Sequence, residues 1–266
     1  SAAALGGPMV TRDTAWAPGT PCWIDLGVAD IPKAAAFYQG LFGWDVFDTG
    51  PDGGGYRMCS IGGLPVAGIG AQASPDSGTY WTTYLASADA DLTAAEIKAA
   101  GGQVMMEPFD VMDVGRMFIA ADPGGAMFGV WEARTHTGMQ LANEPGSLIW
   151  SENMSRHFEA NEAFYGAVFG YQFGDIGAEG MQYATLDLDG KQVGGIGEIG
   201  ADEPAELPAS WRTYFAVADT DAAVAKVTEL GGSVLSPAWD SPYGRMATVS
   251  DDQGAVFSVM SVAAQD

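Results

Sequence analysis

Basic residues are scarce in this chain of 266 amino acids. Only 11 Lys and Arg stand against 34 Asp and Glu, which gives a formal net charge of −23. A surface of that sign repels the phosphates of nucleic acids and the anionic headgroups of membranes. We therefore expect no nucleic-acid partner and no membrane partner for this protein.

Long apolar runs, cysteines and histidines are also few. No apolar run approaches the ~20 residues that span a bilayer. The two cysteines, Cys22 and Cys59, form no Cys-x-x-Cys pair. We expect free, partly buried thiols in a cytoplasmic protein, with a disulfide or a reactive cysteine as the alternative. The two histidines, His136 and His157, are expected to be solvated at the surface, and they are too badly placed for a Ser-His-Asp triad.

The sequence contains one internal repeat. Aromatic and glycine residues recur in register when the second half is placed on the first. The matched pairs include Trp23 with Trp150, Tyr56 with Tyr183, Trp81 with Trp211, and Phe128 with Phe257. We expect two modules at residues 18–135 and 145–263, joined by a linker over residues 136–144. Residues 1–17 are expected to be a cloning remnant, which ends before Met9, followed by an N-terminal arm.

Each half is expected to contain two smaller units of one design. Residues 22–28 have the pattern of a strand, Asp30 is a typical helix N-cap, and Gly43 ends the helix that follows. Three short strands are expected next, separated by Gly, Pro and Asp turns, and the plan then repeats. The predicted fold class is α+β, with four β-α-β-β-β units. Two units together form an open, curved sheet whose concave side is a cleft.

Two motifs resemble those of a known family. The first runs from Val28-Ala-Asp30 to Phe37-Tyr38 and ends at Gly43, and the second is Asp122-Pro-Gly-Gly125. Together they resemble the vicinal oxygen chelate superfamily, which includes glyoxalase I, bleomycin-resistance proteins and extradiol dioxygenases. Within it, the chain is most similar to two-module actinobacterial proteins labelled glyoxalase-like proteins or hydroxylases. The resemblance implies two tandem vicinal-oxygen-chelate modules.

The resemblance also implies where a metal ion would be held. Metal-dependent members of the superfamily carry His and Glu ligands at three cleft positions. These positions hold Trp23, Thr83 and Gly129 in the first module, and Trp150, Thr213 and Ser258 in the second. None of these side chains suits a transition metal, which binds imidazole, thiolate or carboxylate. We therefore predict a member without a metal site and without any other cofactor.

Strand alternation gives a list of expected cleft residues. If Trp23 and Trp150 face the clefts, then Asp25 and Glu152 face them too, one carboxylate in each. The expected ligand-binding residues are Trp23, Tyr56, Trp81, Thr83, Arg116, Met127, Trp131, Trp150, Tyr183, Trp211, Thr213, Arg245, Ser258 and Met260. Aromatic walls suit a flat, largely apolar ligand. The alternative is that the tryptophans are core residues and that the carboxylates are solvated at the cleft mouth.

Three functions are left open by these residues. The first is a metal-free protein, similar to bleomycin-resistance proteins, that sequesters or carries a small aromatic molecule of secondary metabolism. The second is a secondary-metabolism enzyme, such as a hydroxylase, an isomerase or a cyclase helper, that uses Asp25 or Glu152 as acid or base. The third is a metal-dependent lyase or dioxygenase. A monomer or a homodimer is expected, since a fused pair already supplies the contact between two modules.

Overall fold

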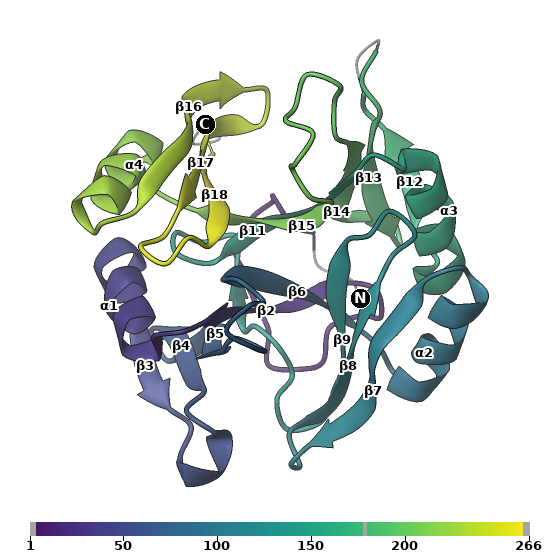
Figure 1. Cartoon of the computed structure of the whole chain (residues 1–266), viewed down its shortest axis with the longest axis horizontal. Coiled ribbons are helices and arrows are strands. Elements are labelled where there is room, and N and C mark those ends of the chain that lie inside the picture. The colour runs from purple at the N-terminus through teal and green to yellow at the C-terminus, as the bar shows by residue number, and fades with distance from the viewer. Residues whose placement is uncertain (1–3, 178–179, 263–266) are drawn as a thin grey trace.

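Two eight-stranded sheets, one from each half of the sequence, form the body of the protein. The computed structural model describes residues 4–177 and 180–262. The first sheet occupies the lower part of Figure 1 and the second the upper part, with the α-helices at the two sides. Each sheet contains two β-α-β-β-β units, so the predicted α+β fold with two tandem modules is confirmed.

The first sheet follows the expected order of elements. Its first unit consists of β2 (Pro21–Val28), α1 (Ile31–Phe42), β3 (Asp45–Asp48), β4 (Arg57–Ile61) and β5 (Leu64–Ala71), with a short 3-10 turn at Pro51–Gly53. Its second unit consists of β6 (Tyr80–Ala86), α2 (Ala90–Ala99), β7 (Gln103–Val111), β8 (Gly115–Ala121) and β9 (Met127–Ala133). The strand order is β3-β4-β5-β2-β6-β9-β8-β7, so β2 and β6 lie antiparallel in the middle.

The second sheet repeats this plan. Its first unit consists of β11 (Leu148–Ser155), α3 (Phe158–Phe169), β12 (Gln172–Asp175), β13 (Tyr183–Leu188) and β14 (Lys191–Glu198). Its second unit consists of β15 (Ser210–Ala216), α4 (Thr220–Glu229), β16 (Ser233–Ser241), β17 (Gly244–Ser250) and β18 (Val256–Ser261). The order is β12-β13-β14-β11-β15-β18-β17-β16, which places β11 and β15 in the middle.

Local sequence signals set the ends of the helices. The Asp30 side chain accepts a hydrogen bond from the backbone N–H of Lys33 at 3.0 Å, which caps α1, and Asp89 and Asp219 cap α2 and α4 in the same way. Gly43 ends α1 with a φ of 70°, a left-handed conformation that favours glycine. These caps confirm the boundaries expected from the sequence. No helix in the described residues is long and apolar enough to cross a membrane.

The linker and the N-terminal arm are held together outside the two sheets. β1 (Val10–Thr11) pairs with β10 (Leu141–Ala142) in an antiparallel ladder. Leu5 is only 3% exposed, and its N–H donates to the carbonyl oxygen of Gln192 in the second module. Leu5, in the segment expected to be a cloning remnant, therefore has a buried apolar side chain.

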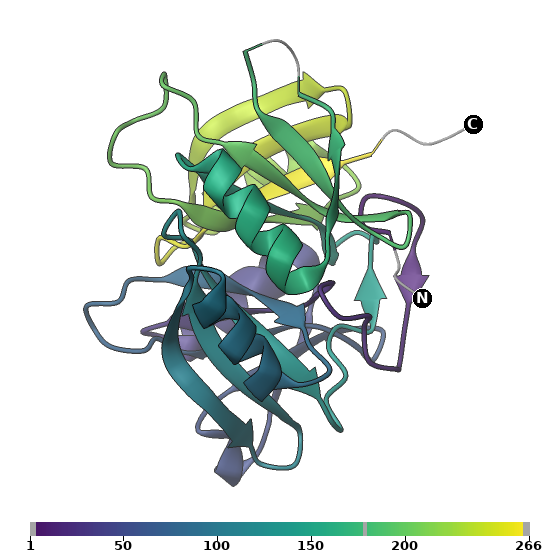
Figure 2. The same cartoon turned by 90° about the vertical axis from the view of Figure 1, so that its right-hand side faces the viewer.

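The two modules meet through their helices and through aromatic side chains. α1 lies beside α4, and α2 lies beside α3, as Figures 1 and 2 show. Phe42 of the first module contacts Phe215 of the second, with ring centroids 4.9 Å apart, and Trp44 contacts the same ring. This shared apolar core leaves the concave face of each sheet pointing away from the other module.

Candidate functional site

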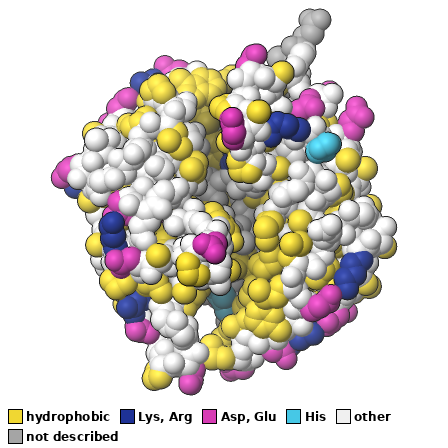
Figure 3. All heavy atoms as spheres, in the orientation of Figure 1, with side chains coloured by type: hydrophobic (Ala, Val, Ile, Leu, Met, Phe, Trp, Pro, Cys, Tyr) yellow, Lys and Arg dark blue, Asp and Glu magenta, His cyan; other side chains and the backbone are white. Residues whose placement is uncertain are grey.

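The middle strands bring three positions of each concave face side by side. In the first sheet Trp23 of β2 pairs with Tyr84 of β6, and Tyr84 pairs with Gly129 of β9. The same three positions of the second sheet hold Trp150, Tyr214 and Ser258. Figure 3 shows the surface hollowed at the top and at the bottom of the view, where the outer strands of each sheet face one another in Figure 1.

A chain of hydrogen bonds crosses the first concave face. Nε1 of Trp23 donates to the hydroxyl of Tyr56 at 2.9 Å, and that hydroxyl donates to Oδ2 of Asp25 at 3.2 Å. The hydroxyl of Tyr84 donates to the same carboxylate oxygen at 3.1 Å. Gly129 makes room for this arrangement, because a Cβ at that position would lie 2.3 Å from Cδ1 of Tyr84. Two phenols and one indole therefore orient a single carboxylate.

The second concave face carries the same arrangement. Nε1 of Trp150 donates to the hydroxyl of Tyr183 at 2.9 Å, and Tyr183 donates to Oε2 of Glu152 at 2.7 Å. Tyr214 donates to Oε1 of Glu152 at 2.9 Å. The two phenols engage different oxygens here, because Glu152 is one methylene longer than Asp25. Both modules therefore place a Trp–Tyr–carboxylate–Tyr constellation in the middle of the sheet.

Burial changes the acidity of the first constellation. Loss of solvent around Asp25 raises the pKa of its carboxyl from 3.8 to about 7, although the hydrogen bonds from Tyr84 and Tyr56 act in the opposite direction. The pKa values of Tyr56 and Tyr84 are raised well above 10, first by burial and then by the charge of Asp25. Asp25 can therefore hold or release a proton near neutral pH, while both phenols stay protonated and donate hydrogen bonds.

The expected concave placement of Trp81 and Trp211 is wrong. Nε1 of Trp81 donates to the hydroxyl of Tyr38 on α1 at 3.2 Å, and Nε1 of Trp211 donates to the hydroxyl of Tyr165 on α3 at 3.0 Å. Both indoles thus lie on the helix-covered face. Their neighbours two residues on, Thr83 and Thr213, share that face, and their hydroxyls are buried without a hydrogen-bond partner.

The physical reason is that both faces of β6 and of β15 carry a large buried aromatic side chain, Trp81 or Trp211 on one face and Tyr84 or Tyr214 on the other. Alternation sorted their residues into two sets correctly but could not decide which set faces the cleft. Tyr84 and Tyr214, which belong to the other set, were missed. No sequence signal separated the two sets, because the internal repeat aligns Thr83-Tyr84 with Thr213-Tyr214 and so matches a member of each set.

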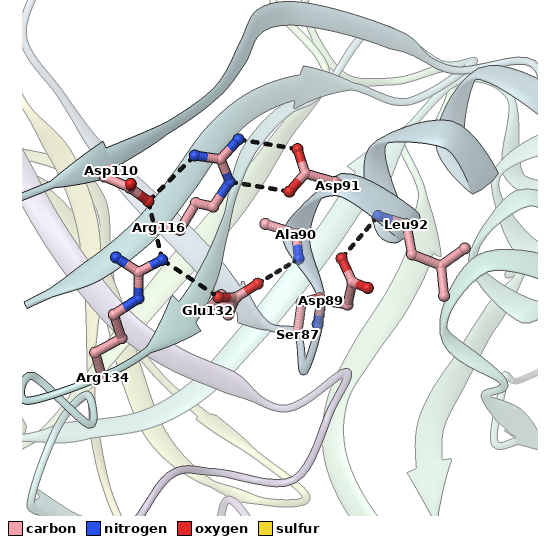
Figure 4. Close-up of polar contacts among 9 residues, drawn as sticks. All are labelled: Ser87, Asp89, Ala90, Asp91, Leu92, Asp110, Arg116, Glu132 and Arg134. Atoms are coloured by element: carbon pink, nitrogen blue, oxygen red, sulfur yellow. Dashed lines mark hydrogen bonds and ion pairs between the residues drawn. The ribbon is translucent and has the colours of Figure 1, made fainter.

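Arg116 and Arg245 also lie on the outer side, where they hold the helices to the sheets. Arg116 of β8 forms two hydrogen bonds with the Asp91 carboxylate on α2, at 2.9 and 3.0 Å, and a third with Asp110 (Figure 4). Arg245 binds Asp221 of α4 and Asp240 in the same way. The hydrogen bonds that the guanidinium groups donate to these carboxylates raise the pKa of both arginines. The expectation that these arginines line the clefts is wrong.

The remaining expected residues lie on the concave faces. Trp131 pairs across the sheet with Met117, and Met127 lies at the rim with 45% of its surface exposed. Met260 is buried beside Tyr214 in the second module. Whether these residues contact a ligand stays a prediction, and the structure establishes only their place on the sheet.

His136 is not a solvated side chain, and that expectation is wrong. Its ring packs edge-on against Trp23 with centroids 4.3 Å apart, and against Trp131 at 5.3 Å. The indole Nε1 of Trp131 donates to the backbone carbonyl of His136 at 2.8 Å. Burial lowers the pKa of His136 to about 4, and its Nε2 has no hydrogen-bond partner. The linker therefore places a neutral imidazole in the first cleft. His157, by contrast, is exposed at the start of α3.

The side chains at the expected ligand positions do not fit a transition metal. With Tyr84 and Tyr214 in place of the threonines, these positions offer indoles, phenols, one hydroxyl and one glycine. Within residues 4–177 and 180–262, no three His, Cys, Asp or Glu side chains come together in a group that could hold a metal ion. Asp25 and Glu152 each lack a second strong ligand beside them.

The fold and the sequences of both modules match one protein superfamily. A family model described as Glyoxalase/Bleomycin resistance protein/Dioxygenase superfamily matches residues 22–130 and 154–259. The chain belongs to this superfamily, as the sequence motifs predicted. It is 41% identical over 254 residues to a Mycobacterium tuberculosis protein named "Putative glyoxylase CFP32", covering 93% of this chain and 96% of that one. It is 37% identical over 264 residues to "Anthracycline biosynthesis protein DnrV" of Streptomyces peucetius, covering 94% and 95%.

Solved structures share the fold at low sequence identity. A Mn(II)-bound glyoxalase from Novosphingobium aromaticivorans superposes with a TM-score of 0.64 at 15% identity, covering 92% of this chain and 82% of that one. The 2,3-dioxygenase LapB from Pseudomonas sp. KL28 gives a TM-score of 0.64 at 12% identity, covering 94% and 93%. These likenesses confirm the architecture and do not extend to chemistry.

Proposed function

We propose that the protein binds a small, aromatic organic molecule on the concave side of its sheets, without a metal ion. The observation that carries this proposal is the repeated constellation of Trp, two Tyr and one carboxylate in the middle of each sheet. Aromatic pairs add ~0.5–1.5 kcal/mol each beyond the burial of apolar area. A carboxylate held by two phenols supplies one oriented polar contact, as is usual in mostly apolar ligand sites.

The biological setting proposed is sequestration, resistance or transport in secondary metabolism. The similarity to DnrV, named for anthracycline biosynthesis, supports this setting. Cys22 and Cys59 are free and buried, and burial raises the pKa of both thiols. Unreactive free thiols support a place in the reducing cytoplasm.

A second candidate function is an enzyme that uses Asp25 as acid or base. The pKa of about 7 for Asp25 favours it, because general acid–base catalysis is most effective when the pKa lies near the working pH. In this case the Asp25→Asn variant would keep ligand binding and lose turnover. Loss of binding in the same variant would instead indicate that the carboxylate serves the ligand contact alone.

Native mass spectrometry of protein freshly purified without chelator tests the proposal. We expect an organic molecule retained by the wild type and lost in the Trp150→Leu variant. Tyr243 lies exposed between β16 and β17, so the Tyr243→Leu variant is the control and should retain the molecule. A stoichiometric transition metal by elemental analysis, or retention that is equal in all three proteins, contradicts the proposal.

A further inference from the structure

The two concave faces differ around their shared constellation. Cross-strand pairing identifies the equivalent positions. Thr82 in the first module corresponds to Arg212 in the second, because they pair with Asp25 and Glu152 respectively. Ile119 corresponds to Thr248, because they pair with Gly129 and Ser258 respectively. Met58 and Thr185 are equivalent in the same sense, because each pairs with a glycine beneath the Tyr56 or the Tyr183 ring. The first face is therefore mainly apolar, whereas the second carries a guanidinium and three hydroxyls.

Arg212 has no counter-ion among the residues that the structure describes. Its neighbours Trp211 and Thr213 face the helices, so its side chain projects on the concave side, directly across from Glu152, where it is partly buried. In the part of the chain that the structure describes, its guanidinium makes no hydrogen bond and no ion pair. The other described arginines are all engaged with carboxylates or backbone carbonyls, at Arg12, Arg57, Arg116, Arg134, Arg156 and Arg245.

A guanidinium without an ion-pair partner favours binding of a planar anion. It offers five N–H donors in a planar fork that matches a carboxylate, and pairing with such an anion is stronger than a neutral hydrogen bond. Glu152 does not meet this need, because its two oxygens accept hydrogen bonds from Tyr183 and Tyr214, and the described residues contain no ion pair between Glu152 and Arg212. The charge of Arg212 acts on Tyr214, whose pKa it tends to lower. Burial and the charge of Glu152 raise the pKa of Tyr214 by more, so the net direction is upward.

The rest of the second face suits an oxygenated aromatic molecule. Ser258 and Thr248 lie side by side with their hydroxyl oxygens 3.0 Å apart, and Ser258 pairs with Tyr214. The Trp150 ring is only partly buried and so leaves aromatic surface available. Hydroxyls can donate or accept, which allows them to meet carbonyl or hydroxyl groups on a ring system.

The first face leaves less aromatic surface available to a ligand. The His136 ring covers Trp23, whose exposure falls to 3%, and Trp131 is held to the His136 carbonyl. The linker that joins the modules thus places the His136 imidazole over Trp23 on the first concave face. A ligand that stacks on Trp23 would have to displace the His136 ring, whereas among the described residues no aromatic ring packs on Trp150, and Gly6 of the N-terminal arm lies near one edge of the indole.

We propose that the second module holds the ligand site, and that Arg212 binds a carboxylate on the aromatic ligand while Trp150 stacks on its ring. This inference rests on the proposed function and adds the module and the anionic group. The net charge of −23 disfavours anionic ligands, so the affinity for a carboxylate-bearing ligand depends on a cation placed directly beside it, such as the partly buried Arg212.

Isothermal titration calorimetry with two matched probes tests this inference. The probes are 2-naphthoate, which is anionic, and 2-naphthamide, its neutral counterpart of nearly the same shape. For the wild type we expect one 2-naphthoate per chain, bound at least tenfold more tightly than 2-naphthamide. In the Arg212→Met variant that preference should disappear, with the affinity for 2-naphthamide changed less than twofold. Arg212→Lys should retain part of the preference and shows that the cation, and not the volume of the side chain, is responsible.

Arg57→Met is the charge-matched control. Arg57 is paired with Asp48 on an outer strand, so its removal changes the net charge of the protein equally but leaves the second face intact. Its 2-naphthoate affinity should equal that of the wild type. An undiminished preference for 2-naphthoate in Arg212→Met, or two equivalent sites per chain, overturns the inference and leaves the proposed function standing. Failure of both probes to bind the wild type overturns the inference and the proposed function together.

Discussion

The hydroxyl of Tyr38, in the first module, donates a 2.7 Å hydrogen bond to Oδ2 of Asp251 in the second. The equivalent hydrogen bond runs in the other direction: the hydroxyl of Tyr165 in the second module donates to Oδ2 of Asp122 in the first, also at 2.7 Å. Asp122 and Asp251 also accept hydrogen bonds from the backbone of their own turns. The Phe-Tyr motif of each module therefore contacts the turn before the last strand of the other module, which is Asp122-Pro-Gly-Gly125 in the first and Asp251-Asp-Gln-Gly254 in the second.

The Tyr38→Phe variant should be clearly less stable. It removes the hydrogen bond to a buried carboxylate, and such bonds to charged groups contribute about 1.5–3 kcal/mol. Urea unfolding, followed by tryptophan fluorescence, should show a lower midpoint with an unchanged slope. Tyr165→Phe is the matched variant across the interface and should lose a similar amount. A midpoint equal to that of the wild type in both variants contradicts this view of the interface.

Asp25 should make stability depend on pH. Its pKa is about 7 in the folded protein against 3.8 for an unperturbed carboxyl, so the folded state binds the proton more tightly. Between these two pH values the unfolded state has already lost the proton, and stability therefore falls as pH rises from about 4 to about 7. Asp25→Asn, which mimics the neutral form, should flatten this fall relative to the wild type. Urea unfolding of both proteins from pH 4.5 to 8 gives the free energy of unfolding at each pH. Curves of this free energy against pH that run parallel for the two proteins contradict the prediction.

His136 should contribute a dependence of the opposite sign. Burial lowers its pKa to about 4, below the value of 6.5 for a free imidazole, so the unfolded state binds more protons between these values. Its contribution to stability is thus present above pH 6.5 and is lost as the pH falls toward 4. His136→Phe should remove this loss at low pH while keeping the ring contacts with Trp23 and Trp131. We measure the free energy of unfolding of the wild type and of the variant between pH 4.5 and 7. A difference between the two proteins that does not change with pH contradicts a buried neutral imidazole.

Gly129 should tolerate no side chain. A Cβ added there lies 2.3 Å from the Tyr84 ring, so Gly129→Ala forces the ring away from Asp25 or strains the strand, at a cost of about 1–3 kcal/mol. The equivalent Ser258 already has a Cβ beside Tyr214, so Ser258→Ala should cost less than Gly129→Ala. Thermal unfolding of the two variants provides the comparison. If both variants lose the same small amount of stability, Tyr84 does not need the space above Gly129.

The fold could be predicted from the sequence because its signals are local or repeated. Asp30 and Gly43 mark helix ends by their own chemistry, and the recurrence of Trp23 at Trp150 reveals the duplication. The orientation of β6 could not be predicted, because Trp81 and Tyr84 are both large and both buried. Only the pairing of Trp23 with Tyr84 across the sheet shows which of them faces the cleft, and that register is a property of the tertiary structure.

The place of His136 lay beyond sequence reasoning for a similar reason. A polar residue in a predicted linker is normally solvated, and nothing near it in the sequence indicates a partner. Its burial depends on the path of the linker over the sheet, where β1 and β10 hold the chain and Trp131 binds the His136 carbonyl. Arg212 was likewise missed, since its importance rests on the absence of a partner within the described structure.

A crystal structure of the protein, purified without chelator and soaked with 2-naphthoate, tests the central claim most directly. We expect density for the naphthalene ring against Trp150 in the second module, with its carboxylate on Arg212 and no metal ion beside Glu152. Density for an ion held by three or more protein atoms in either concavity, or a probe bound away from both sheets, would contradict it.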